Sequence, residues 1–224
     1  MNKKKIRDYL IDYLENEEVI KFELAPTDKY SNGLPELWKD IMTSKNPVEE
    51  TFSKLWLPFI DLLPETIKGL RHKLREIGLL ETKEYPFSLI YVYEENGEPV
   101  FSRGYPVCSI DRDDAKLLPS DFLKLYKIHN GWTDLNGFMG FLPVEDWFDL
   151  NDYYDGEYSD ILPGIRLKDF LIICESGSNE YLGFDLSKKP PVGLFCAVGD
   201  PVEVVPDVVR ALDKWMAIEF DDLS

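Results

Sequence analysis

The chain has 224 residues, of which 44% are apolar and 13% aromatic, so it can bury a sizeable core and global disorder is not expected. It has no apolar run close to the about twenty residues of a transmembrane helix, and acids interrupt the segment that follows residues 1–5. The sequence therefore predicts neither a membrane span nor a secretory signal.

The net charge of −17 is concentrated in the second half of the chain. Residues 1–105 carry 15 basic and 19 acidic side chains, whereas residues 106–224 carry 10 and 23. A field of this sign repels nucleic acid and anionic membranes, and it would attract a basic protein partner. An acidic surface that only keeps the protein soluble is the alternative interpretation.

The three cysteines, Cys108, Cys174 and Cys196, are odd in number and far apart. This usage favours reduced thiols in a cytoplasmic protein over a disulfide framework. Cys174 and Cys196 lie inside apolar runs and are expected in the core.

Residues 1–84 are predicted to form a helical N-terminal region that packs on the domain following it. An amphipathic helix is expected over 2–16, a second over 34–45, and at least two more over 47–81, broken near Pro58 or Pro64.

Strand patterns begin at Tyr85. Residues 87–107 read as a hairpin around Asn96-Gly97, and the first run is apolar on both faces, as expected of an interior strand.

The segment 118–130 has the pattern of a buried helix. Pro119, Ser120 and Asp121 suit its first turn, and Asn130-Gly131 suits its end, because these residues tolerate the left-handed conformation. One apolar stripe runs along it: Leu118, Phe122, Leu125, Tyr126 and His129.

Three strand-like runs follow, at 169–175, 180–186 and 192–198, and a helix is expected over 206–220. The short connections between the runs favour antiparallel neighbours. Residues 85–224 are thus predicted to be an α+β domain, with an antiparallel or mixed sheet flanked by helices.

The helix that opens with Leu-Pro-x-Asp-Phe at 118–122 and closes with His-Asn-Gly at 129–131 resembles the signature of the SUKH superfamily, the Smi/Knr-like proteins. The later elements are similar too, with Gly177, Gly-Phe-Asp at 183–185 and Pro-Val at 191–192 in the expected order. This resemblance covers roughly residues 105–220. It implies a family of bacterial immunity proteins and fungal cell-wall regulators.

No catalytic, cofactor or metal site is predicted. The two histidines, His72 and His129, read as a solvated and a buried structural residue, and there is no Cys-x-x-Cys pair. The acids over 149–160 lack the spacing of an EF-hand, which leaves a weak divalent-cation site as an open alternative. SGSN at 176–179 lacks the pattern of a phosphate-binding loop.

The candidate partner-binding surface is a stretch in which acids alternate with large aromatics, the combination that suits a hot spot for basic residues. The alternative is a solvated acidic loop without a partner. The predicted partner-binding residues are Trp132, Asp134, Glu145, Asp146, Asp149, Asp152, Tyr153, Tyr154, Asp155, Glu157, Tyr158 and Asp160.

The resemblance and the acidic surface together predict a non-enzymatic immunity protein. It would bind and neutralise a cognate bacterial toxin domain with a basic surface, such as a nuclease or another nucleic-acid-directed toxin. The alternatives are an intracellular Smi/Knr-like scaffold or regulatory protein and a metal-dependent hydrolase. The oligomeric state and the role of residues 1–84 stay open.

Overall fold

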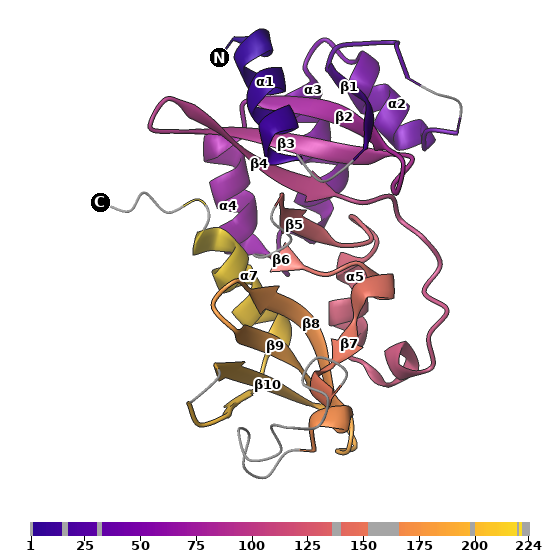
Figure 1. Ribbon diagram of the computed structural model, residues 1–224. Coiled ribbons are helices and arrows are strands. Elements are labelled where there is room, and N and C mark those ends of the chain that lie inside the picture. The colour runs from indigo at the N-terminus through magenta and orange to yellow at the C-terminus, as the bar shows by residue number, and fades with distance from the viewer. Residues whose placement is uncertain are drawn as a thin grey trace.

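The computed structural model describes residues 2–14, 18–30, 33–135, 140–151, 166–197, 200–218 and 220. They form two antiparallel sheets with helices packed around them, which confirms the predicted α+β class (Figure 1). No helix in these ranges combines the length and hydrophobicity that a bilayer span requires.

The larger sheet has six strands that follow one another in chain order, each antiparallel to the next. The Asn96-Gly97 turn between β3 and β4 adopts φ values of 51° and 81°, as the sequence predicted for a tight hairpin. The strands are β1 (Val19–Leu24), β2 (Glu76–Thr82), β3 (Ser88–Glu95), β4 (Glu98–Gly104), β5 (Trp132–Asp134) and β6 (Gly140–Phe141).

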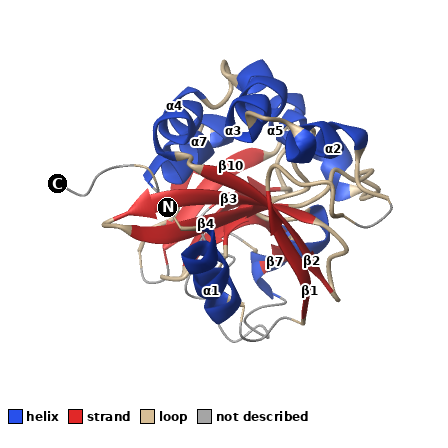
Figure 2. Cartoon of the chain, turned by 90° about the horizontal axis from the view of Figure 1, so that it is seen from above, coloured by secondary structure: helices blue, strands red, loops and turns tan. Residues whose placement is uncertain are grey.

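Helices cover both faces of this sheet, which explains why β3 is apolar on both sides. Ile90 and Val92 pack under helix α1 (Lys3–Tyr13), whereas Leu89 and Tyr91 face the main core. Figure 2 shows α1 on one side of the sheet, with α2 and the other core helices on the opposite side. Those helices are α2 (Glu36–Thr43), α3 (Pro47–Thr51), which continues as a π-helical turn over Phe52–Trp56 and a 3₁₀ turn over Leu57–Phe59, and α4 (Pro64–Lys73).

The smaller sheet contains the predicted three-strand meander and has the order β11-β10-β9-β8-β7. Its strands are β7 (Phe148–Asp149), β8 (Phe170–Ser176), β9 (Glu180–Asp185), β10 (Val192–Ala197) and β11 (Glu203–Val205). Helix α7 (Val208–Ile218) contacts both β6 and β9, and the Leu142 N–H donates to the Ile173 carbonyl at 2.9 Å. The two sheets are therefore joined by a helix and by a direct backbone bond (Figure 1). Single 3₁₀ turns lie at Asp114–Leu117, Val144–Asp146 and Leu167–Asp169.

The expectation that residues 1–84 contain only helices is corrected by β1 and β2. Residues 76–81, read as the end of a helical segment, form a strand whose side chains are almost all buried. A short apolar run has no periodicity that separates a buried strand from a buried helix, and pairing with β3 decides the outcome.

The helix predicted over 118–130 is also shorter in the structure, where α5 spans Ser120–Leu125. Its predicted apolar stripe is nevertheless buried throughout, from Leu118 at 6% exposure to His129 at 0%. Three turn residues after α5 bring His129 to the same interior. The packing was therefore predicted correctly even though regular helix ends early.

The main core includes residues from Ala25 to Phe220 and so runs across the predicted boundary at residue 85. Trp56 from the N-terminal region packs edge-on against Tyr91 and Trp132. The division into residues 1–84 and 85–224 stays a prediction, but the two parts share one interior.

Candidate functional site

The turn His129-Asn130-Gly131 holds together two segments that are distant in sequence. The Asn130 N–H donates to the Tyr105 carbonyl at 3.1 Å, and the Tyr105 N–H donates to the Gly131 carbonyl at 3.2 Å. The Asn130 amide then binds the next segment: its oxygen accepts from Val144 N–H at 3.2 Å, and its nitrogen donates to Glu145 Oε2 at 2.7 Å. This one side chain fixes where residues 144–146 leave the core.

Two glycines make this arrangement sterically feasible. Gly131 has φ of +92°, and a Cβ there would lie 2.5 Å from the Pro143 nitrogen. Gly104, at the end of β4, lies under the imidazole of His129, which a Cβ would approach to 2.5 Å. Larger residues at either position would displace the turn.

Beside the turn, two tyrosine rings pack at an angle of 57° to each other around a buried arginine. The rings of Tyr85 and Tyr105 have centroids 4.7 Å apart, and the Arg103 guanidinium carbon lies 5.0 Å and 4.9 Å from them. Arg103 is 3% exposed, and its Nε donates to Ser88 Oγ at 2.9 Å. Cation–π contacts of this kind hold both rings in place at the surface.

Acidic side chains border the tyrosine pair. Partial burial, followed by the charges of Glu145 and Glu84, raises the pKa of Asp146. Burial and then the Asp146 carboxylate raise the pKa of Tyr85. These mutual effects place the three carboxylates and the tyrosines in one electrostatic neighbourhood. We call this set the acidic–aromatic surface: Glu84, Tyr85, Tyr105, Glu145 and Asp146.

The structure brings only some of the predicted partner-binding residues together. Glu145 and Asp146 are exposed and adjacent, whereas Asp134 and Asp149 are half-buried in β5 and β7. Trp132 is 0% exposed and packs on Trp56, so its assignment to the surface is corrected: it is a core residue. The other predicted residues lie outside the described residues, and their role stays a prediction: Asp152, Tyr153, Tyr154, Asp155, Glu157, Tyr158 and Asp160.

Sequence reasoning did not select Glu84, Tyr85 or Tyr105 for this surface. Tyr85 belongs to the β2–β3 turn, and Tyr105 follows β4, so no local pattern connects them to Glu145. The connection passes through the backbone bonds of Asn130 and Gly131 to Tyr105. The His-Asn-Gly turn was visible in the sequence, but its bonding partners were not.

The same turn ends a buried hydrogen-bond chain that has one consistent set of donors. The Trp56 indole N–H donates to the Tyr91 hydroxyl at 3.0 Å, and this hydroxyl donates to His129 Nε2 at 2.6 Å. The His129 Nδ1–H donates to the Tyr105 carbonyl at 3.2 Å. Burial lowers the pKa of His129 to about 3, so the ring is neutral at physiological pH and serves as a structural connector.

The remaining nucleophiles do not form a reactive group. Burial raises the pKa of the Cys174 and Cys196 thiols, and partial burial together with Glu145 raises that of Cys108. Reactive cysteines need the opposite shift. Within the described ranges, no three His, Cys, Asp or Glu side chains are grouped to hold a metal ion.

Residues 116–217 match the SMI1 / KNR4 family (SUKH-1), a little under half of the chain. The match contains α5 and strands β5 to β11 and extends through most of α7. The match identifies residues 116–217 as a SUKH-superfamily segment, as the Leu-Pro and His-Asn-Gly signature indicated. The superfamily is known for immunity proteins and is generally non-catalytic.

One curated relative is Aminopeptidase C of Lactobacillus delbrueckii subsp. lactis, which is 32% identical over 85 residues. The aligned part is 34% of this chain and 18% of the aminopeptidase, so the chain spans less than a fifth of that relative's length. We carry no activity over from so short a match. No solved structure matches the chain.

Proposed function

We propose that the protein is a SUKH immunity protein that binds and neutralises a cognate bacterial toxin domain. The partner is a protein with a basic surface, such as a nuclease or another nucleic-acid-directed toxin. The site of action is the cytoplasm, and the described cysteines, all free thiols, support a reducing compartment.

The observation that carries this proposal is the acidic–aromatic surface beside the His129-Asn130-Gly131 turn. Tyrosine rings held by Arg103 offer contact area with little loss of side-chain entropy, and the exposed carboxylates beside them suit arginine and lysine. Toxins that act on nucleic acid need basic grooves. A chain with net charge −17 would be attracted to such a groove over a long range.

The test is charge reversal within this surface. The double variant Glu84→Lys and Asp146→Lys leaves the Asn130–Glu145 bond intact, so the turn should keep its structure. We expect the association rate with the cognate toxin to fall by about tenfold or more, with a weaker dependence on salt. Stopped-flow or surface-based kinetics at several salt concentrations would measure both.

The matched control is Glu49→Lys with Asp61→Lys, two exposed acids for which no ion pair among the described residues is known. It changes the net charge equally but lies far in sequence from the surface. If both double variants slow association equally, only total charge matters and the surface has no specific role. If neither does, the toxin binds elsewhere or is not the partner.

A further inference from the structure

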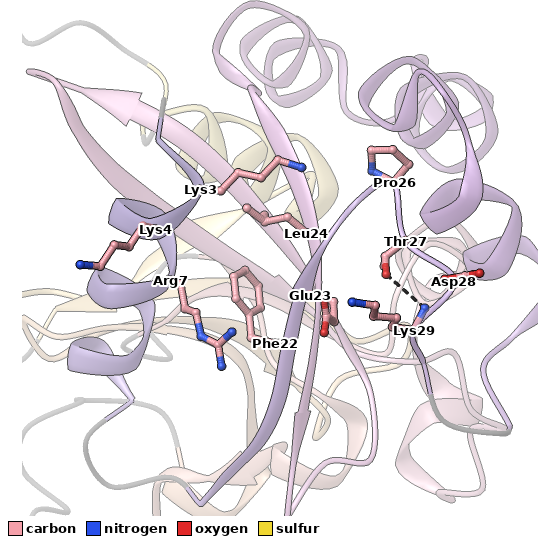
Figure 3. A pocket seen from close by; sticks show the side chains of 10 residues that line it. All are labelled: Lys3, Lys4, Arg7, Phe22, Glu23, Leu24, Pro26, Thr27, Asp28 and Lys29. Atoms are coloured by element: carbon pink, nitrogen blue, oxygen red, sulfur yellow. Dashed lines mark hydrogen bonds between the residues drawn. The ribbon is translucent and has the colours of Figure 1, made fainter.

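A groove of about 540 Å³ opens beside helix α1, at the other end of β1 from the acidic–aromatic surface. The β1–β2 register places Val19 beside Thr82, close to Tyr85, whereas Leu24 pairs with Gly78 at the groove end. Figure 3 shows α1 as one wall, β1 as the floor and the segment after Pro26 as the other wall. The residues lining it are Lys3, Lys4, Arg7, Phe22, Glu23, Leu24, Pro26, Thr27, Asp28 and Lys29.

Four basic and two acidic side chains line the groove, which gives it a net positive charge on a strongly acidic protein. The two acids are Glu23 and Asp28. Lys3, Lys4, Arg7 and Lys29 are all exposed, and none of them forms an ion pair with a described residue. Many other cations of the chain do, including Lys5, which binds Glu98 at 2.8 Å. In Figure 3, Lys3 extends from α1 toward the opposite wall, and Lys29 extends back from that wall.

The positive charge in the first turn of α1 destabilises the helix. It has lysines at its start and no acidic residue, although the amino end of a helix dipole favours negative charge. Asn2 caps this end of the helix by accepting from the Lys4 N–H at 2.9 Å, and a bound anion would relieve the remaining repulsion between the lysines and the helix dipole.

The floor of the groove is partly apolar, which limits the kind of anion that fits. The Phe22 ring packs against Gly78, where a Cβ would come within 2.5 Å of the ring, and Leu24 is only half-buried beside it. Pro26 is exposed at the far wall. A free phosphate would use the cations but not this floor. A nucleic acid would bring a dense row of charges toward a protein of net charge −17.

We propose that this groove is a second protein-docking site that binds an extended acidic peptide segment carrying an apolar side chain. The carboxylates pair with Lys3, Arg7 and Lys29, and the apolar side chain lies on Leu24 and Pro26. The site is separate from the acidic–aromatic surface. It attracts negatively charged partners, whereas that surface attracts positively charged ones. The protein therefore has one surface for a basic partner and another for an acidic segment.

The test uses fluorescence anisotropy with the full chain and a short labelled peptide of glutamates around a central leucine. We expect saturable binding that weakens with salt and falls at least about tenfold in the triple variant Lys3→Glu, Arg7→Glu and Lys29→Glu. Exchanging the glutamates for glutamine, or the leucine for serine, should weaken the peptide as well. The control variant Lys45→Glu, Lys127→Glu and Lys214→Glu changes the net charge equally at exposed sites elsewhere and should bind as wild type.

Three results would overturn the proposal: no saturable peptide binding, equal losses in both triple variants, or tighter binding of a single-stranded oligonucleotide that the groove variant abolishes. Toxin association separates this proposal from the proposed function. The groove triple variant should associate with the toxin at the wild-type rate. The double variant Glu84→Lys and Asp146→Lys should bind the peptide as tightly as wild type. Circular dichroism spectra of all variants should overlay, since every changed side chain is exposed.

Discussion

The part of the chain before the family match and the part inside it contribute to the same six-stranded sheet. Strands β1 to β4 come from residues 19–104, whereas β5 and β6 come from the segment at 116–217. The family segment therefore adds two short strands to a sheet built mainly from outside it. The segment that matches the SUKH family model is therefore completed by the residues that precede it.

The two parts are also joined where α7 meets α4. Asp213 of α7 is 0% exposed, and its carboxylate accepts from the backbone N–H groups of Thr66 at 2.9 Å and Glu65 at 3.2 Å. These are first-turn donors of α4, whose own N-cap residue makes no side-chain bond. A carboxylate from the family segment thus caps a helix of the N-terminal region.

Removing residues 1–84 should have the largest effect on the stability of the protein. The remaining chain would expose Tyr91 and Trp132 where Trp56 now covers them, and it would lose two strands of the sheet. The loss should exceed the whole stability of a typical domain, about 5–15 kcal/mol. We expect no cooperative thermal transition by circular dichroism. A truncated chain that melts sharply would establish residues 85–224 as an independent domain.

Replacing Asp213 with alanine should have the next largest effect. It leaves one buried and one partly buried N–H group of α4 without an acceptor, and we expect a loss of about 2–4 kcal/mol in the free energy of unfolding. Urea titration followed by tryptophan fluorescence would measure it. Lys214→Ala, at the exposed neighbouring position, should unfold near the wild-type midpoint. Equal midpoints for both variants would show that the contact between α4 and α7 contributes little.

The pH dependence set by His129 should be the smallest effect when it is taken per pH unit. Its pKa is lowered to about 3 in the folded protein, whereas an unfolded histidine titrates near about 6.5. The unfolded chain therefore binds one more proton between these values. The stability from this residue is complete above about pH 6.5, and it is lost as the pH falls, by at most about 1.4 kcal/mol per pH unit.

Urea unfolding at several pH values would detect this slope as a difference between variants. His129→Phe should be less stable at neutral pH, because the Tyr91 hydroxyl loses its acceptor, and it should lack the histidine part of the slope. His72→Gln, at an exposed position, should keep the wild-type slope. Parallel curves for wild type and His129→Phe would contradict a neutral buried ring.

Local patterns predicted the elements whose signal lies within a few neighbouring residues. Asn96-Gly97 marked its hairpin because both residues adopt positive φ, and the meander over 170–197 was marked by apolar runs between short turns. Strand β2 was missed because its residues are buried on both faces and follow a helix directly. Only the pairing with β1 and β3 makes it a strand.

The candidate site was harder to predict because tertiary bonds assemble it. Trp132 follows a helix stop and precedes acids, a pattern that also suits an exposed aromatic, yet Trp56 and Tyr91 enclose it. Tyr85 joins the surface through a tilted ring contact with Tyr105 that connects two separate loops. Neither contact can be predicted from the spacing of residues along the chain, because both join residues that are distant in sequence.

The close approach of Gly104 to His129 limits how this protein can be recombined with its relatives. Because the imidazole occupies the space where a side chain at 104 would lie, the end of the β3–β4 hairpin and the His129 turn have to match each other. A chimera with its crossover between residues 104 and 129 would succeed only when the donor also supplies a glycine at the end of that hairpin.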